Sequence, residues 1–144
     1  MTGDAAGERL ARIRRAGGER GEALAARYLE GRGWTILARR LRVGRDEIDL
    51  LAVEPGEAGA LVVVEVRARS SGRFGSPEES VDRRKVARLY RAAAGLRASG
   101  SLPDGRALPR LPWRVDLVAV DVAPALGPAA GGPAIRHLRA LEPG

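Results

Sequence analysis

The segment Leu61-Val-Val-Val-Glu-Val-Arg-Ala68 decides the fold, because it is an almost continuous run of β-branched residues. Such a run predicts a central strand that is covered on both faces, as in an α/β protein. Side chains alternate along a strand, so Glu65 shares a face with Leu61 and Val63. A carboxylate that extends an apolar face is costly unless it is paired or binds a metal ion. Glu65 is therefore the first candidate for a functional residue.

A second acid lies in the preceding strand, Glu47-Ile-Asp-Leu-Leu-Ala-Val53, where Asp49 shares a face with apolar residues. The turn over residues 54–60 sets the antiparallel register and predicts that Asp49 lies opposite Glu65, with the Cβ atoms roughly 5 Å apart. Two bare carboxylates at this separation repel each other, and a divalent cation removes the conflict. Oxygen ligands in a chain without Cys favour Mg²⁺ or Mn²⁺ over zinc.

Helical spacing and turn residues extend this hairpin to an α/β fold with the element order α-β-β-β-α-β-β. A basic, flexible tail is expected over residues 1–16, and a single domain over residues 17–144. The expected elements of that domain are a helix at about 19–30, strands at 34–41, 46–53 and 61–68, a helix at 79–98, and strands at 113–122 and 134–141.

The charge of the chain is divided into blocks. The 24 Arg and one Lys against 18 acids give a net charge of +7. Residues 8–45 carry +7, residues 46–66 carry −6 and residues 67–97 carry +6. An acidic block between two basic ones suits a protein that attracts a polyanion and holds a cation. The lack of a signal peptide and of any long apolar run predicts a cytoplasmic protein without membrane contact.

Three further polar residues lie at positions that favour burial. Glu22 is on a helix face made of small and apolar residues, where a salt bridge to one of the many Arg and a role at the metal site are equally good interpretations. Asp116 interrupts an apolar strand, and an internal salt bridge to Arg114 is the preferred interpretation. His137 is the only His and is expected to be structural or on the surface.

Several short motifs follow one another along the chain in a characteristic order. They are Gly21-Glu-Ala-Leu-Ala25, Asp46-Glu-Ile-Asp-Leu-Leu51, Val63-Val-Glu-Val-Arg-Ala-Arg69, Phe74-Gly-Ser-Pro77, Arg84-Lys85, Arg114-Val-Asp-Leu-Val118 and Ile135-Arg-His-Leu-Arg-Ala-Leu141. With these motifs the sequence resembles the PD-(D/E)xK nuclease superfamily, which has the restriction-endonuclease-like fold. Within that superfamily it resembles the YraN family of small bacterial proteins, and the resemblance extends from about Gly18 to Leu141.

This resemblance implies a four- to five-stranded mixed sheet flanked by helices. It also implies one or two Mg²⁺ or Mn²⁺ ions and hydrolysis of phosphodiester bonds in DNA or RNA. Carried over to this chain, Asp49 and Glu65 would be metal ligands, the carbonyl of Val66 a further ligand and Glu22 a supporting acid. Nucleic acid is the implied partner, and a homodimer is left open because related nucleases often pair.

The chain departs from the superfamily motif at Arg67, where the motif ends in Lys. Arg supplies positive charge and bidentate phosphate contacts, but it does not accept a proton. Three interpretations stay open: Arg67 is an electrostatic substitute, the Lys function has moved to Lys85 on the following helix, or the site only binds. The matching functions are a Mg²⁺-dependent endonuclease-like protein and a catalytically silent nucleic-acid-binding module, with a protein-interaction adaptor as a third class.

Basic and aromatic residues after the central strand are predicted to contact nucleic acid. Arg69, Arg73 and Phe74 could clamp a strand by phosphate contact and base stacking, although a loop without function is the alternative. Arg84 and Lys85, at the start of the second helix, are predicted to contact phosphate.

Overall fold

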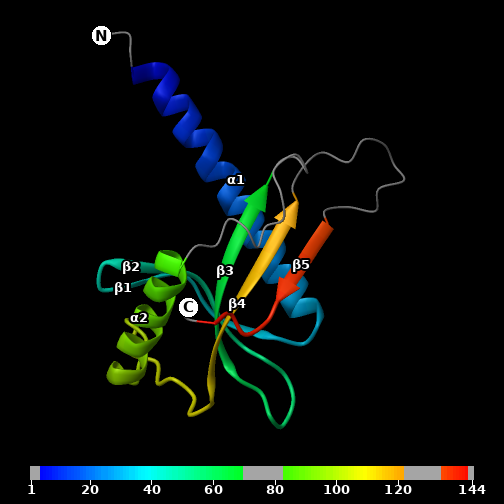
Figure 1. Ribbon diagram of the computed structural model, residues 1–144, viewed down its shortest axis with the longest axis vertical. Coiled ribbons are helices and arrows are strands. Elements are labelled where there is room, and N and C mark those ends of the chain that lie inside the picture. The colour runs from blue at the N-terminus through cyan, green and yellow to red at the C-terminus, as the bar shows by residue number, and fades with distance from the viewer. Residues whose placement is uncertain (1–3, 70–82, 122–133, 143–144) are drawn as a thin grey trace.

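The computed structural model describes residues 4–69, 83–121 and 134–142. Its elements are α1 (Asp4–Gly31), β1 (Thr35–Val43), β2 (Asp46–Val53), β3 (Leu61–Arg69), α2 (Arg83–Ser99), β4 (Trp113–Asp121) and β5 (Ala134–Leu138). Figure 1 shows a five-stranded sheet with α1 and α2 packed against it. The predicted order α-β-β-β-α-β-β and the predicted mixed sheet flanked by helices are therefore confirmed.

The strands are ordered β1-β2-β3-β4-β5, and only β3 and β4 run parallel. A parallel pair needs a crossover connection, and α2 lies in the segment that joins these two strands. The antiparallel pairing of β2 and β3 includes Leu50↔Val64 and Val53↔Leu61, which is the register predicted from the hairpin turn.

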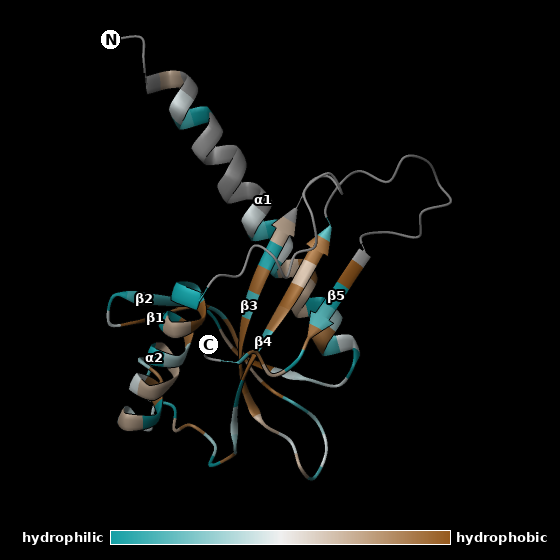
Figure 2. Ribbon diagram, viewed as in Figure 1, coloured by the Kyte–Doolittle hydropathy of each residue, from teal (hydrophilic) through white to brown (hydrophobic). Residues whose placement is uncertain are grey.

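Two apolar clusters cover the two faces of the sheet, and β3 contributes to both. Val62 and Val64 pack into the cluster that contains Ala25, Ala26 and Leu29 of α1. Leu61 and Val63 pack into the cluster that contains Leu89, Ala92, Ala93 and Leu96 of α2. All four residues of β3 are fully buried, and Figure 2 shows hydrophobic residues concentrated along β3 and β4. Burial on both faces explains the continuous run of β-branched residues.

The first helix is longer than predicted. It begins at Asp4, so the prediction of an irregular tail over residues 1–16 is wrong from that residue on. The segment is rich in Ala, Arg, Glu and Leu, which are strong helix formers. Gly17 and Gly18 each cost about 1 kcal/mol in a helix, but they do not end it. No helix among the described residues is long and apolar enough to cross a membrane.

The other element boundaries differ from the prediction by a few residues. The first strand extends to Val43. β5 ends at Leu138, three residues before the predicted end, because Ala140 has a φ of 58° and turns the chain out of the extended conformation. The start predicted for the second helix, at residue 79, lies outside the described residues.

Gly21 sets how closely α1 approaches β3. A Cβ atom at this position would lie 2.6 Å from the Cβ atom of Ala68. Gly21→Ala is therefore expected to destabilise the fold by about 1–2 kcal/mol in urea unfolding, because overpacking outweighs the better helix propensity of Ala. Gly18→Ala is the matched control: an added Cβ meets nothing within 4 Å, so we expect a slight gain in stability. Equal effects of the two substitutions would contradict this close packing.

Candidate metal centre

Glu65 lies where β3 leaves the apolar cluster that faces α2. Its side chain is only 4% exposed. The Oε1 atom lies 3.4 Å from Nζ of Lys85 and 3.6 Å from Nε of Arg67. Oε2 is buried and has no hydrogen-bond partner within the described part of the chain. One oxygen of this carboxylate thus faces two cations, while the other lacks a protein donor.

Asp49 lies at the point where the backbone pairing of β2 and β3 stops. The last paired residues before it are Leu50 and Val64. Beyond them, Oδ2 of Asp49 accepts a hydrogen bond of 2.8 Å from the backbone N–H of Val66. Ile48 and Leu50 contact opposite apolar clusters, so the side-chain alternation on which the sequence prediction relied is interrupted at Asp49. The carboxylate therefore joins the two strands where their ladder ends.

The electrostatics of Asp49 reflect a neighbouring acid. Burial, followed by the negative charge of Glu65, raises the pKa of Asp49 to about 7. The hydrogen bond from Val66 and the charge of Lys85 lower this pKa, but they do not compensate. The charge of Glu65 thus disfavours ionisation of Asp49, as expected for two acids that lie close together.

Glu22 approaches this site from α1, and it is already paired. Its Oε2 atom accepts a hydrogen bond of 2.7 Å from Nε of Arg40, and Nη1 of Arg40 donates one of 3.2 Å to Oε1 of Glu19. The charge of Glu22 still contributes to the raised pKa of Asp49. Glu22 therefore forms the salt bridge that one interpretation predicted, and its role at a metal site stays a prediction.

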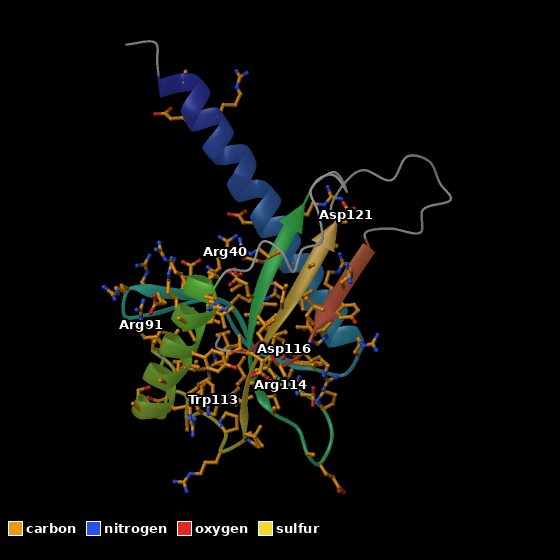
Figure 3. All side chains as sticks on the ribbon, viewed as in Figure 1. Arg40, Arg91, Trp113, Arg114, Asp116 and Asp121 are labelled. Atoms are coloured by element: carbon orange, nitrogen blue, oxygen red, sulfur yellow. The ribbon has the colours of Figure 1, made fainter. Side chains whose placement is uncertain are left out.

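Arg40, labelled in Figure 3, is a residue that the sequence did not single out. Its φ of 50° lies in the left-handed region, which is uncommon for residues other than Gly. The strand β1 also shifts register between Ile36 and Ala38. Neither irregularity has a signature in the sequence, so the position of the Arg40 side chain could not be predicted.

Lys85 and Arg67 come from different elements and meet at Glu65. Arg67 follows Glu65 by two residues on β3, and its Nε atom is buried without a hydrogen-bond partner in the described structure. Lys85 lies in the first turn of α2. The structure thus brings together four of the five predicted catalytic candidates, Asp49, Glu65, Arg67 and Lys85, and places the fifth, Glu22, beside them.

The predicted nucleic-acid contacts are only partly within the described structure. Arg84 is exposed at the start of α2, next to Lys85. Arg69 ends β3, but its side chain is outside the described atoms. Arg73 and Phe74 lie outside the described residues.

The donor set is suited to a hard cation. The described residues contain no group of three or more His, Cys, Asp or Glu side chains that could hold a metal ion. The candidate ligands are therefore two carboxylates, those of Asp49 and Glu65, with the backbone carbonyl of Val66 nearby in β3. Mg²⁺ usually binds one or two carboxylates and keeps several waters. The unpartnered Oε2 of Glu65 and the raised pKa of Asp49 are both features that a divalent cation would relieve.

A second buried polar cluster surrounds Asp116, which Figure 3 labels beside Arg114. Asp116 is fully buried and accepts hydrogen bonds of 2.8 and 2.9 Å from Arg114 and of 2.9 Å from the N–H of Ala140. Nε2 of His137 lies 2.8 Å from the same carboxylate, and its ring packs against Trp34. The predicted salt bridge and the structural role of His137 are thus confirmed. Burial alone raises the pKa of Asp116, but these hydrogen bonds outweigh burial and lower it to about 2.

Residues 21–120 match the sequence profile of a family described as "Uncharacterised protein family UPF0102". The chain belongs to this family. The predicted membership of the YraN family is thereby confirmed. The matched UPF0102 region contains Glu22, Asp49, Glu65, Arg67 and Lys85, and so it includes every predicted catalytic residue.

Similar UPF0102 proteins come from several bacteria. The UPF0102 protein of Arthrobacter sp. (strain FB24) is 39% identical over 124 residues, which are 86% of this chain and 93% of the relative. The one from Nocardioides sp. is 38% identical over 141 residues, or 98% and 99% of the two chains. The one from Moorella thermoacetica is 46% identical over 107 residues, or 74% and 82%.

Proposed function

We propose that this UPF0102 chain binds nucleic acid and hydrolyses its phosphodiester bonds with Mg²⁺ or Mn²⁺. The observation that carries the proposal is the buried Oε2 of Glu65, which has no hydrogen-bond partner among the described residues, close to the carboxylate of Asp49, whose pKa is raised. A buried carboxylate oxygen without a donor costs free energy unless a ligand compensates for it. Asp49 and Glu65 would hold the ion, with the carbonyl of Val66 as a further ligand. When bound, the ion supplies positive charge at the phosphate and makes water more acidic.

The two cations at Glu65 divide the role of the motif Lys. Arg67 stays protonated, so it stabilises negative charge on phosphate but does not take up a proton. Lys85 presents a compact ammonium group 3.4 Å from Oε1 of Glu65, from which it can bind a phosphate oxygen or a water molecule. We therefore assign stabilisation of negative charge to Arg67, and the contact with a phosphate oxygen or water to Lys85. In the reaction the oxygen of water bonds to phosphorus, the P–O ester bond breaks and the departing oxygen gains a proton.

The test is cleavage of labelled single-stranded, duplex and branched DNA and RNA by the full chain. We expect cleavage with Mg²⁺ or Mn²⁺ and none in EDTA, and we expect calorimetry to detect Mn²⁺ binding. Lys85→Met should lower the cleavage rate without loss of Mn²⁺ binding, because Lys85 contacts a ligand and is not itself one. The absence of Mn²⁺ binding, or cleavage that persists in EDTA, would contradict the proposal.

A catalytically silent nucleic-acid-binding module is the second candidate, and Arg67 at the motif Lys position is the observation that favours it. It predicts binding that weakens with salt, is unaffected by chelators and is accompanied by no turnover. Binding that does not depend on salt would instead favour a protein-interaction adaptor.

A further inference from the structure

A basic groove lies beside α2, and it includes Arg84, the neighbour of Lys85 in the sequence. It is open, has a volume of about 530 Å³ and lies between the first half of α2 and the β1–β2 turn. Its charged lining residues are four arginines, Arg45, Arg84, Arg88 and Arg91, and one acid, Asp46, which together carry a net charge of +3.

Both carboxylate oxygens of Asp46, the acid in the described lining of the groove, accept hydrogen bonds. Asp46 accepts hydrogen bonds of 2.9 Å from Nε and 2.7 Å from a terminal nitrogen of Arg91, where α2 meets the β1–β2 hairpin (Figure 3). These hydrogen bonds and the charges of Arg91, Arg45 and Arg88 hold the pKa of Asp46 below its usual range, so it stays ionised. Among the described residues, no carboxylate lies within ion-pair distance of Arg84 or Arg88. Within the described residues, Asp46 therefore pairs with Arg91, and no acid competes with an anion for Arg84 or Arg88.

The groove and the candidate metal centre both include a residue from the first turn of α2. Arg84 precedes Lys85, the residue that contacts Glu65. Arg88 lies one helical turn further on the same side as Arg84, about 6 Å along the axis. Exposed guanidinium groups that are spread over this length fit successive phosphates of a polymer. A site for one small anion would instead have its donors converge on a single point.

We propose that this groove binds the backbone of a nucleic-acid strand on one side of the phosphate at Asp49 and Glu65, an inference that rests on the proposed function of that site. Arg84 and Arg88 contact phosphates, and Arg45 extends the contact at the β1–β2 turn. Contacts to phosphate fix the position of the strand without reading its sequence.

The test is the salt dependence of DNA binding in EDTA, where cleavage is blocked, with a short labelled duplex as the probe. Each phosphate contact contributes about 0.9 to the slope of log K against log salt concentration. Arg84→Gln/Arg88→Gln should therefore lower the slope by about 2 for any duplex sequence. The matched control is Arg27→Gln/Arg110→Gln, which removes the same charge from two exposed positions outside the groove and should leave the slope unchanged.

Asp46→Asn should change DNA binding and its salt dependence in the opposite direction. It removes the one acid among the described lining residues and releases Arg91, so binding should become tighter and the slope steeper by up to about 1. Three outcomes would overturn the groove proposal. They are equal slopes for the two double variants, weaker binding by Asp46→Asn with an unchanged melting temperature, and no binding by the wild-type chain. Absence of cleavage together with the expected slopes would leave the groove in place and contradict only the nuclease proposal.

Discussion

Asp49→Asn is expected to abolish metal-dependent cleavage and yet to stabilise the metal-free protein above about pH 7. Loss of a group that merely orients a metal ligand costs about 10–100-fold, so loss of the ligand itself should exceed about 100-fold. The side-chain oxygen of Asn can still accept the hydrogen bond from Val66. The pKa of Asp49 is about 7 in the folded chain against an ordinary 3.8, so its ionisation reduces stability as the pH rises between these values. An uncharged Asn avoids this loss.

Melting temperatures in EDTA at about pH 4 and about pH 8 measure the effect on stability, and cleavage in Mn²⁺ measures the effect on activity. We expect Mn²⁺ to raise the melting temperature of the wild type, because the ion binds the folded state, and to have no such effect on Asp49→Asn. Glu47→Gln is the matched control, since Glu47 is exposed on the same strand. Wild-type cleavage by Asp49→Asn would exclude a ligand role, and a lower melting temperature at about pH 8 would argue against repulsion between the two buried acids.

The proximity of Asp49 and Glu65 could be predicted because it depends only on local features. One short turn sets the register of β2 and β3, and the continuous apolar run marks β3 as central. The same reasoning found Glu22, whose neighbours on α1 are apolar. The contact of Lys85 with Glu65 is different in kind, because it depends on how α2 packs on the sheet. Sequence suggested the residue but could not supply the distance.

The other contacts were beyond prediction for identifiable reasons. His137 reaches Asp116 through the register of β4 and β5, and residues 122–133, which join these strands, are too many for a turn that fixes register. Arg40 reaches Glu22 through a left-handed backbone and an irregular strand. Paired glycines suggested that the first helix starts at Glu19, but the good helix formers before them outweigh that signal.

Asp116→Ala is expected to destabilise the fold by about 3–5 kcal/mol, because it removes one partner from a buried ion pair. The substitution leaves the N–H of Ala140, the ring of His137 and one side of the Arg114 guanidinium without an acceptor. Urea unfolding measures the change. The matched control is Asp104→Ala, which breaks an exposed pair with Arg106 and should cost less than about 1 kcal/mol. Similar losses in the two variants would show that the cluster is no more important than a surface pair.

Asp116→Asn preserves the shape of the side chain, and so it tests the charge even if the Ala variant does not fold. The pKa of Asp116 is about 2 in the folded chain and 3.8 ordinarily, so its ionised form stabilises the fold above the ordinary value. This contribution is lost as the pH falls from about 4 to about 2. The stability difference between wild type and Asp116→Asn should therefore shrink over that acid range. A difference that does not change with pH would mean that the cluster stabilises the fold through its shape and not through the charge of Asp116.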